Sequence, residues 1–295
     1  MYAYLSHLIS SAFEAWAGAV VVVLPSLAFF VLLALVVKGK EALAAFERAF
    51  DDVRMNFSLY FLDAIFVAPW LAVLANLIQD GVSSAGLTLI SPMRWAAVPS
   101  LVILLAVVLV GDFVSYWRHR LEHTRLLWPA HAIHHSDVHM TWTTLGRFHP
   151  LNRLSTQVVD LGILAILGFP KWALVANFMV RHYYGEYIHA DLPWMYGRFR
   201  YVFVSPVMHR WHHARDVVGA GSNFATVFAF IDYGFGTYHV PGLCDVPLGV
   251  NDEMGKGTVG QMLYPFKAWG ARLREASGDP PAAADKVLEL NGPDA

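Results

Sequence analysis

The sequence has little charge and almost no cysteine. Charged residues make up 15% of its 295 residues, the formal net charge is −2, and Cys244 is the single cysteine. One cysteine excludes an internal disulfide framework and the cysteine-rich metal sites. Because the chain has no surplus of basic residues, we expect no nucleic-acid partner. Histidine, with 14 residues, is the remaining candidate for metal ligation.

Apolar residues dominate instead. They form 56% of the chain, and the mean hydropathy is +0.44. Three apolar stretches, residues 17–37, 61–78 and 95–110, are candidates to cross a bilayer as helices, and Pro25 is expected to kink the first. The first stretch is too long for a signal-peptide core, so it is interpreted as a retained anchor. The sequence therefore predicts an all-α, polytopic membrane bundle, with three transmembrane helices in residues 1–115.

The distribution of basic residues predicts the orientation. Four basic residues lie between the first and second stretches, in a loop expected over residues 38–60, whereas Arg94 alone lies between the second and third. The positive-inside rule places the 38–60 loop in the cytoplasm and the amino terminus outside. Three crossings then place everything after residue 114 on the cytoplasmic side, where we expect a histidine-rich helical cap and the active site.

A fourth apolar stretch, residues 158–180, is interrupted at residues 168–171 by Gly-Phe-Pro-Lys. Histidine-rich segments flank this stretch on both sides and should share one site. We therefore expect a membrane hairpin over about residues 156–188, within a catalytic region of residues 116–240; the alternative is a single crossing. Residues 241–295 are expected to be a polar tail, with residues 275–295 disordered because they are rich in Ala, Pro, Asp and Gly.

The histidines are patterned. Every histidine except His7 lies between positions 119 and 239, and three groups stand out within that window. The first has the spacing H-x-x-x-H, and the other two share the spacing H-x-x-H-H, so each group presents its imidazoles on one helical face. Pro129, Ser205 and Pro206 mark the helix starts before the second and third groups. The eight members are His119, His123, His131, His134, His135, His209, His212 and His213.

Eight imidazoles exceed what one ion uses, so two metal ions are implied. His7, His139 and His239 lie outside the repeated spacing and are interpreted as ordinary structural residues. Imidazole binds zinc, copper, iron and nickel alike, so residue chemistry alone leaves the metal open.

These motifs also carry a family resemblance. Residues 112–238 resemble the fatty acid hydroxylase and sterol desaturase superfamily, whereas the first 90 residues match it only in hydropathy. The matching segments are Asp112-x-x-x-Tyr116-x-x-His119-x-x-x-His123, His131-x-x-His134-His135-Ser136-Asp137, Thr144-x-x-Arg147-x-His149-Pro150, Pro206-x-Met208-His209-Arg210-x-His212-His213 and Phe235-Gly236-Thr237-Tyr238. The resemblance implies a non-haem di-iron centre that activates dioxygen, with those eight histidines and His189 as ligands.

The chain departs from the family pattern at three positions. Asn152 replaces a frequent glutamate, Asp191 replaces an asparagine, and Ile231 stands where tryptophan is usual. None of these changes removes a ligand, but each affects the surroundings of the ligands or the substrate class. Residues expected to support the ligands from behind are His149, Asp112, Asp191, Asp232 and His182. Direct metal ligation is the alternative for His149 and, less favoured, for His182.

The resemblance implies an enzyme that hydroxylates a lipid, such as a fatty acyl chain or a sterol, with dioxygen and two external electrons. A lipid desaturase on the same centre is one alternative. A zinc-dependent membrane hydrolase or a non-catalytic metal-handling protein is an alternative of another class, and zinc is the alternative occupant of the site.

No flavin, nicotinamide or haem motif is present, so we expect a separate electron donor: a ferredoxin, a small cytochrome or a reductase. Four arginines form a candidate docking surface for this donor, although they equally suit positive-inside anchoring: Arg198, Arg200, Arg210 and Arg215. The sequence assigns no oligomeric state.

Overall fold

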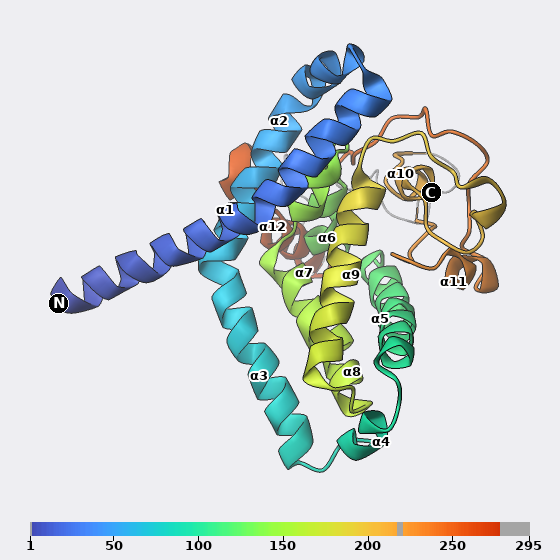
Figure 1. Ribbon diagram of the computed structural model, residues 1–295. Helices are drawn as coiled ribbons and strands as arrows, with labels where there is room; N and C mark the ends of the chain where they lie inside the picture. Colours follow the sequence, from blue (N-terminus) through green and yellow to red (C-terminus); the bar gives the residue numbers. More distant parts are fainter. Residues whose placement is uncertain (1, 217–220, 278–295) are drawn as a thin grey trace.

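The computed structural model describes residues 2–216 and 221–277, and these residues form helices without any β-strand. The elements are α1 (Tyr2–Lys38), α2 (Glu41–Leu62), η1 (Asp63–Val67), α3 (Ala68–Ser84), α4 (Pro92–Ala96), α5 (Ser100–Glu122), α6 (Trp128–His135), η2 (Trp142–Gly146), α7 (Pro150–Ser155), η3 (Thr156–Leu161), α8 (Gly162–Ile166), α9 (Lys171–His189), η4 (Gly197–Phe199), α10 (Pro206–His212), α11 (Ala229–Gly234) and α12 (Gly257–Ser277). Figure 1 shows α3, α5, α8 and α9 extending to one side of the region that holds α6 and α10. The predicted all-α class is confirmed.

Among the described residues, three helices are long and apolar enough to cross a membrane: Phe13–Lys38, Glu41–Ser84 and Ser100–Glu122. They contain most of the three predicted stretches. Large apolar side chains on them remain exposed, such as Phe66 at 68% and Trp70 at 74%. A bilayer is the solvent that suits such a surface, and the chain is an integral membrane protein.

The expected loop over residues 38–60 is wrong. Residues 41–62 form α2, which continues through the π-turn η1 into α3 as one helix of 44 residues. Hydropathy missed α2 because charged residues are interspersed with its apolar ones: Ala49 and Leu59 are buried, whereas Arg48 and Arg54 are exposed. Amphipathic helices of this kind are stabilised by tertiary packing, here mainly against η2.

Two glycines let the apolar helices approach each other. On α5, a Cβ added to Gly111 would lie 2.5 Å from Oδ1 of Asn177 on α9, so the two helices pack closely there. Gly168 adopts φ +75° at the bend between α8 and α9, and its missing Cβ leaves room for the carbonyl of Ile90. Residues 150–189 therefore fold back on themselves, and the two ends of this segment lie near the same region of the molecule (Figure 1).

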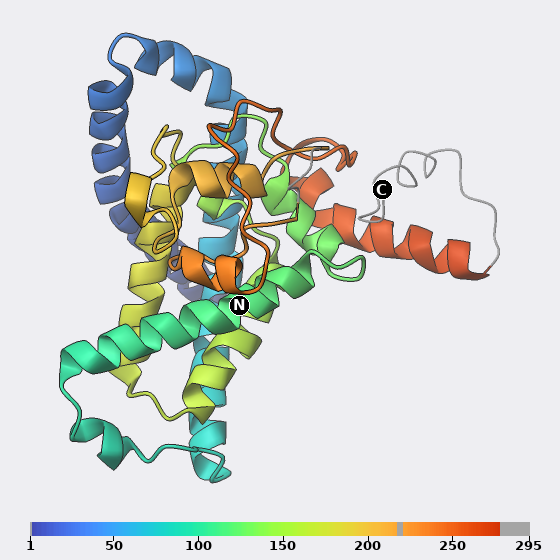
Figure 2. The ribbon, with the colours of Figure 1, turned by 90° about the vertical axis from the view of Figure 1, so that its right-hand side faces the viewer.

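Helix α12 lies in the segment where the sequence suggested only a polar tail. Met254, Tyr264 and Ala268 pack against Ile133 of α6 and Leu59 of α2. In Figure 2 the end of α12 extends away from the body of the molecule. Of the segment expected to be disordered, residues 275–277 belong to α12 and residues 278–295 lie outside the described part of the chain.

Candidate metal centre

The ends of four helices present the predicted ligands. His119 lies in the last turn of α5 and His123 is its C-cap, α6 carries the second group, and His189 ends α9. Helix α10 carries His209 and His212 and is capped by His213. Its start follows the sequence signal, because the Ser205 hydroxyl accepts a hydrogen bond from the backbone N–H of Met208, and Pro206 comes next.

The structure brings these nine histidines into two clusters. Within each cluster, one nitrogen from every imidazole lies within 4.8 Å of the others. The first cluster contains His119, His123, His131, His135 and His212; the second contains His134, His189, His209 and His213. All are buried except His119 and His123, which are half-buried. The resemblance supplied the predicted ligand set, and the fold places its members in groups of five and four.

Nitrogen–nitrogen distances within the clusters are short. The Nε2 atom of His131 lies 3.0 Å from that of His119 and 3.1 Å from that of His135. In the second cluster, Nε2 of His189 lies 3.1 Å from that of His134 and 2.9 Å from that of His209. Two nitrogens in neighbouring positions around one ion, each at about 2.1 Å, lie about 3 Å apart. The spacing thus matches imidazoles that share an ion.

Backbone carbonyls fix the orientation of three rings. Nδ1 of His119 lies 2.8 Å from the Phe224 carbonyl, and Nδ1 of His212 lies 2.6 Å from the Ser222 carbonyl. Nδ1 of His189 lies 2.6 Å from the carbonyl of Gly185. A carbonyl accepts only, so Nδ1 carries the proton in each case. The lone pair of Nε2 then faces the cluster, as a metal ligand requires.

Asp112 and Asp232 hold the loop that supplies the Phe224 carbonyl. Asp112 accepts hydrogen bonds from the backbone N–H groups of residues 226–228, at 2.7–3.0 Å. Asp232 accepts from the N–H groups of Phe224 and Ala225 at 2.7 and 2.9 Å, and from the Thr237 hydroxyl. Neither carboxylate is a member of a histidine cluster, so both act on His119 through the backbone.

The other three residues expected to support the ligands lie farther out. His149 caps α7, accepting from the Leu151 N–H through Nδ1 and facing the Met262 carbonyl at 3.2 Å through Nε2. His182 lies 3.5 Å from the carboxylate of Glu186. Asp191 is half-exposed and pairs with Lys38 and Arg210. None of the three belongs to either cluster.

The histidines outside the repeated spacing also stay apart from the clusters. His139 is 49% exposed and lies 3.3 Å from Asp52, whereas the ring of His239 packs edge-on against Trp211. The side chain of His7 lies outside the described part of the chain.

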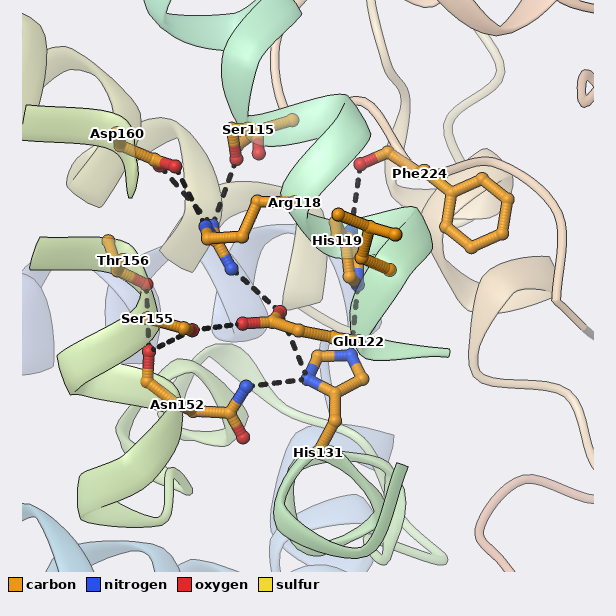
Figure 3. Close-up of polar contacts among 12 residues, drawn as sticks. Ser115, Arg118, His119, Glu122, His131, Asn152, Ser155, Thr156, Asp160 and Phe224 are labelled. Carbon is orange, nitrogen blue, oxygen red and sulfur yellow. Dashed lines mark hydrogen bonds and ion pairs between the residues drawn. The ribbon is translucent and has the colours of Figure 1, made fainter. Parts of the chain in front are cut away.

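Sequence reasoning missed a charged network behind His131 (Figure 3). Nδ1 of His131 lies 3.2 Å from the amide nitrogen of Asn152 and 3.6 Å from a carboxylate oxygen of Glu122. Arg118 donates to Glu122 at 2.6 Å and to Asp160 at 2.8 Å. Asn152 was noted only as a departure from the family pattern. Glu122 could have been singled out from the sequence, because this carboxylate lies between His119 and His123, two predicted ligands at the end of one helix.

Burial keeps the imidazoles neutral. Desolvation, reinforced by neighbouring imidazoles, lowers the pKa of the six histidines on α6 and α10 well below the usual value. Neutral imidazole is the form that binds metal. In this respect the clusters favour metal ions over protons.

Several buried ring nitrogens have no hydrogen-bond partner among the described residues. They are Nε2 of His123 and His212, Nδ1 of His134 and His209, and both nitrogens of His213. Unpaired buried polar atoms are costly, at about 1–3 kcal/mol each. Metal ions would satisfy those that face the clusters. The all-nitrogen donor set fits iron, zinc, copper and nickel.

Comparison with known proteins agrees with this geometry. Residues 104–237 match the model of a family described as fatty acid hydroxylase. The chain is 28% identical to ornithine lipid hydroxylase OlsE of Rhizobium tropici over 167 residues, which are 56% of this chain and 50% of that protein. It is 28% identical to human (Homo sapiens) alkylglycerol monooxygenase over 128 residues, or 43% of this chain and 28% of that protein.

Methylsterol monooxygenase 1-3 of Arabidopsis thaliana is 30% identical over 142 residues, covering 44% of this chain and 45% of that protein. The chain thus spans about half or less of the length of these relatives. No solved structure matches it. The matched region contains most of α5 and all of α6 to α11, which carry all nine clustered histidines and the loop behind them. The similarity to the fatty acid hydroxylase family is thus confined to residues 104–237, the part of the chain that holds both histidine clusters.

Proposed function

We propose that the protein is a membrane oxygenase that hydroxylates a lipid, using dioxygen, external electrons and two iron ions held by the two histidine clusters. The observation that carries this proposal is the pair of clusters, in which neighbouring Nε2 atoms lie 2.9–3.1 Å apart. The relatives support the substrate class, since the names of the three relatives above describe the oxidation of lipids.

The five-histidine cluster would hold one ion and the four-histidine cluster the other. Bound iron would supply the redox chemistry that activates dioxygen and breaks an unactivated C–H bond. The protein's own groups have a different task. The carbonyls of Phe224, Ser222 and Gly185 keep protons on the outer nitrogens of three imidazoles, and Phe148 stacks on His134 at 4.3 Å and holds the plane of that ring. Burial keeps bulk water from seven of the nine clustered histidines.

The substrate would enter from the bilayer. Helices α5 and α9 pack together along the apolar part of the molecule, and each ends at the histidine clusters. A lipid lying between such helices needs no transfer into water before reaching the centre. We place the clusters on the cytoplasmic side, following the excess of basic residues between the first two apolar stretches.

An external donor would supply the two electrons of each turnover. Of the four arginines in the candidate docking surface, Arg210 pairs with Asp191 at 3.1 Å and Arg215 lies 3.8 Å from Asp216. Arg198 and Arg200 remain exposed: Arg198 lies over the Phe199 ring, and Arg200 lies over the Tyr201 ring and donates a hydrogen bond to a tyrosine hydroxyl at 2.7 Å. These two are therefore the better candidates for contact with an acidic donor protein.

The experiment combines metal analysis with isotopically labelled dioxygen. Full-length protein purified without oxygen should contain iron, and a supplied reductant and lipid extract should give a lipid product whose new hydroxyl carries the label. Label found only in water would indicate a desaturase instead. Turnover under strict anaerobiosis, or with zinc as the sole metal, would overturn the oxygenase proposal in favour of a hydrolase. Bound metal without any lipid turnover would indicate metal handling.

A further inference from the structure

A cavity of about 500 Å³ lies between α1 and α9. Its walls are largely aromatic: Phe29 and Phe30 come from α1, and Tyr183, Tyr184 and Tyr187 come from α9. Phe29 and Tyr183 are 55% and 42% exposed, so the cavity opens to the outside of the molecule. Its size is typical of sites that bind a small ligand, which usually measure about 300–1,000 Å³.

One wall of this apolar cavity carries a carboxylate. Glu186 is 5% exposed and lines the cavity together with Ser26. One carboxylate oxygen accepts a hydrogen bond from the Ser26 hydroxyl at 2.7 Å, and the other lies 3.5 Å from Nε2 of His182. Among the described residues, no lysine or arginine forms an ion pair with Glu186. A single hydroxyl leaves most of the acceptor capacity of a carboxylate unused.

The position makes this carboxylate costly. Ser26, its hydrogen-bond partner, lies near the middle of the candidate span Phe13–Lys38. A buried carboxylate in apolar surroundings is strongly destabilising unless a positive charge or several donors compensate it. Ionisable residues at such positions in membrane proteins usually mark a functional site.

The carboxylate also lies close to the metal centre. His182, Glu186 and His189 follow one another at i, i+4 and i+7, so they share one face of α9. Glu186 precedes His189, a member of the four-histidine cluster, by less than one turn, roughly 4.5 Å along the helix axis. A molecule in the cavity would therefore lie next to the cluster.

We propose that this cavity binds a lipid with a cationic, amine-bearing polar group, whose ammonium donates to the Glu186 carboxylate while its chain lies along the aromatic wall. Charge complementarity selects this occupant. A free fatty acid would bring a second carboxylate into the same apolar space, and an uncharged lipid would leave Glu186 without a counter-charge. To identify this lipid as the substrate of the enzyme rests on the proposed function. The binding of the lipid in the cavity does not depend on that function.

The test uses two nitroxide-labelled probes of equal chain length, a hexadecylammonium and a hexadecanoate, with the full chain in detergent. Binding is measured as the immobilised fraction in the electron paramagnetic resonance spectrum. We expect the ammonium to bind at least about tenfold more tightly, which corresponds to ~1.4 kcal/mol. Glu186→Gln should abolish this preference and Glu186→Asp should retain part of it. The matched control, Glu47→Gln on the exposed face of α2, should leave it unchanged.

A second variant separates the polar contact from the cavity. Val180 lines the cavity and is half-buried, so Val180→Trp should fill the space and weaken the binding of both probes. Equal binding of the two probes by the unaltered protein, or an ammonium preference that survives in Glu186→Gln, would overturn the proposal. Metal content and dioxygen uptake, measured on the same preparations, test the proposed function separately. An ammonium preference in a protein that never consumes dioxygen would leave this inference standing and remove the oxygenase.

Discussion

At the scale of the residue, His212 illustrates how one imidazole is fixed from both sides. Its Nδ1 lies 2.6 Å from the Ser222 carbonyl, and its buried Nε2 belongs to the five-histidine cluster without any hydrogen-bond partner in the described part of the chain. A ring held in this way can do little at Nε2 except bind a metal or remain unpaired.

We therefore expect His212→Ala to abolish lipid turnover and to lower the affinity for one of the two metal ions by about 10- to 100-fold or more. Loss of a residue that hydrogen-bonds to a ligand costs about 10- to 100-fold in metal affinity, and loss of the ligand itself should cost at least as much. Metal analysis of the purified variant and a turnover assay measure this. His239→Ala, which removes a ring that only packs on Trp211, should leave both quantities largely intact. Normal turnover with a full metal content in the His212 variant would contradict the ligand assignment.

The same burial predicts a pH dependence of stability. The pKa values of the six histidines on α6 and α10 are lowered in the folded protein. Below about pH 6.5, the usual pKa of histidine, the unfolded chain takes up protons that the folded metal-free protein does not. The free energy of unfolding is therefore fully present above this pH and falls as the pH is lowered through it.

We expect the melting temperature of metal-free protein in detergent to fall steeply between about pH 7.5 and pH 5.5. The limit is about 1.4 kcal/mol per pH unit for each histidine. Tryptophan fluorescence during heating provides the measurement, and metal-loaded protein is the comparison. A melting temperature that stays constant over this interval would mean that the buried imidazoles do not titrate on unfolding.

At the scale of the element, the bend between α8 and α9 depends on Gly168. Its φ of +75° disfavours any side chain, and a Cβ there would collide with the backbone carbonyl of Ile90. We expect Gly168→Ala to destabilise the protein by about 2–5 kcal/mol, from left-handed backbone strain and overpacking together. Gly162, at the start of α8, is the matched control.

No atom lies within 4 Å of the position that a Cβ would take at Gly162, and its backbone is helical, so Gly162→Ala should be neutral or stabilising. Thermal unfolding of both variants compares them directly. Equal melting temperatures for the two alanine variants would show that this bend is not strained by a side chain.

Some helices could be predicted from the sequence and others could not. Strong local signals marked the start of α10, where Ser205 and Pro206 stand in the expected positions. Helices α2 and α12 gave no comparable signal, because charged residues interrupt their apolar ones and they are stabilised by packing against η2 and α6, respectively. Hydropathy detects a helix that a bilayer surrounds, but an amphipathic helix depends on partners distant in the sequence.

At the scale of the whole molecule, the number of crossings sets the sides on which the termini lie. If the three long helices each cross the membrane and the segment around Gly168 folds back, we expect the amino terminus outside and the carboxyl terminus in the cytoplasm. Reporter domains fused before Met1 and after Ala295 should therefore report opposite compartments. Both reporters in one compartment would mean that one of the three long helices does not cross the membrane. Helix α1, whose first part extends away from the other helices, would be the first candidate (Figure 1).

Sequence alone determined the helical class, the membrane setting and, through the family resemblance, the nine histidines. Those features depend on local quantities: the length of apolar runs, and spacing along a helix. Tertiary structure decided how the histidines divide into groups of five and four. It also brought Glu122 and Asn152 to His131, and placed Glu186 in an aromatic cavity one turn from His189. The clusters and the cavity join helices far apart in the sequence, whose relative positions follow from packing and not from any local pattern.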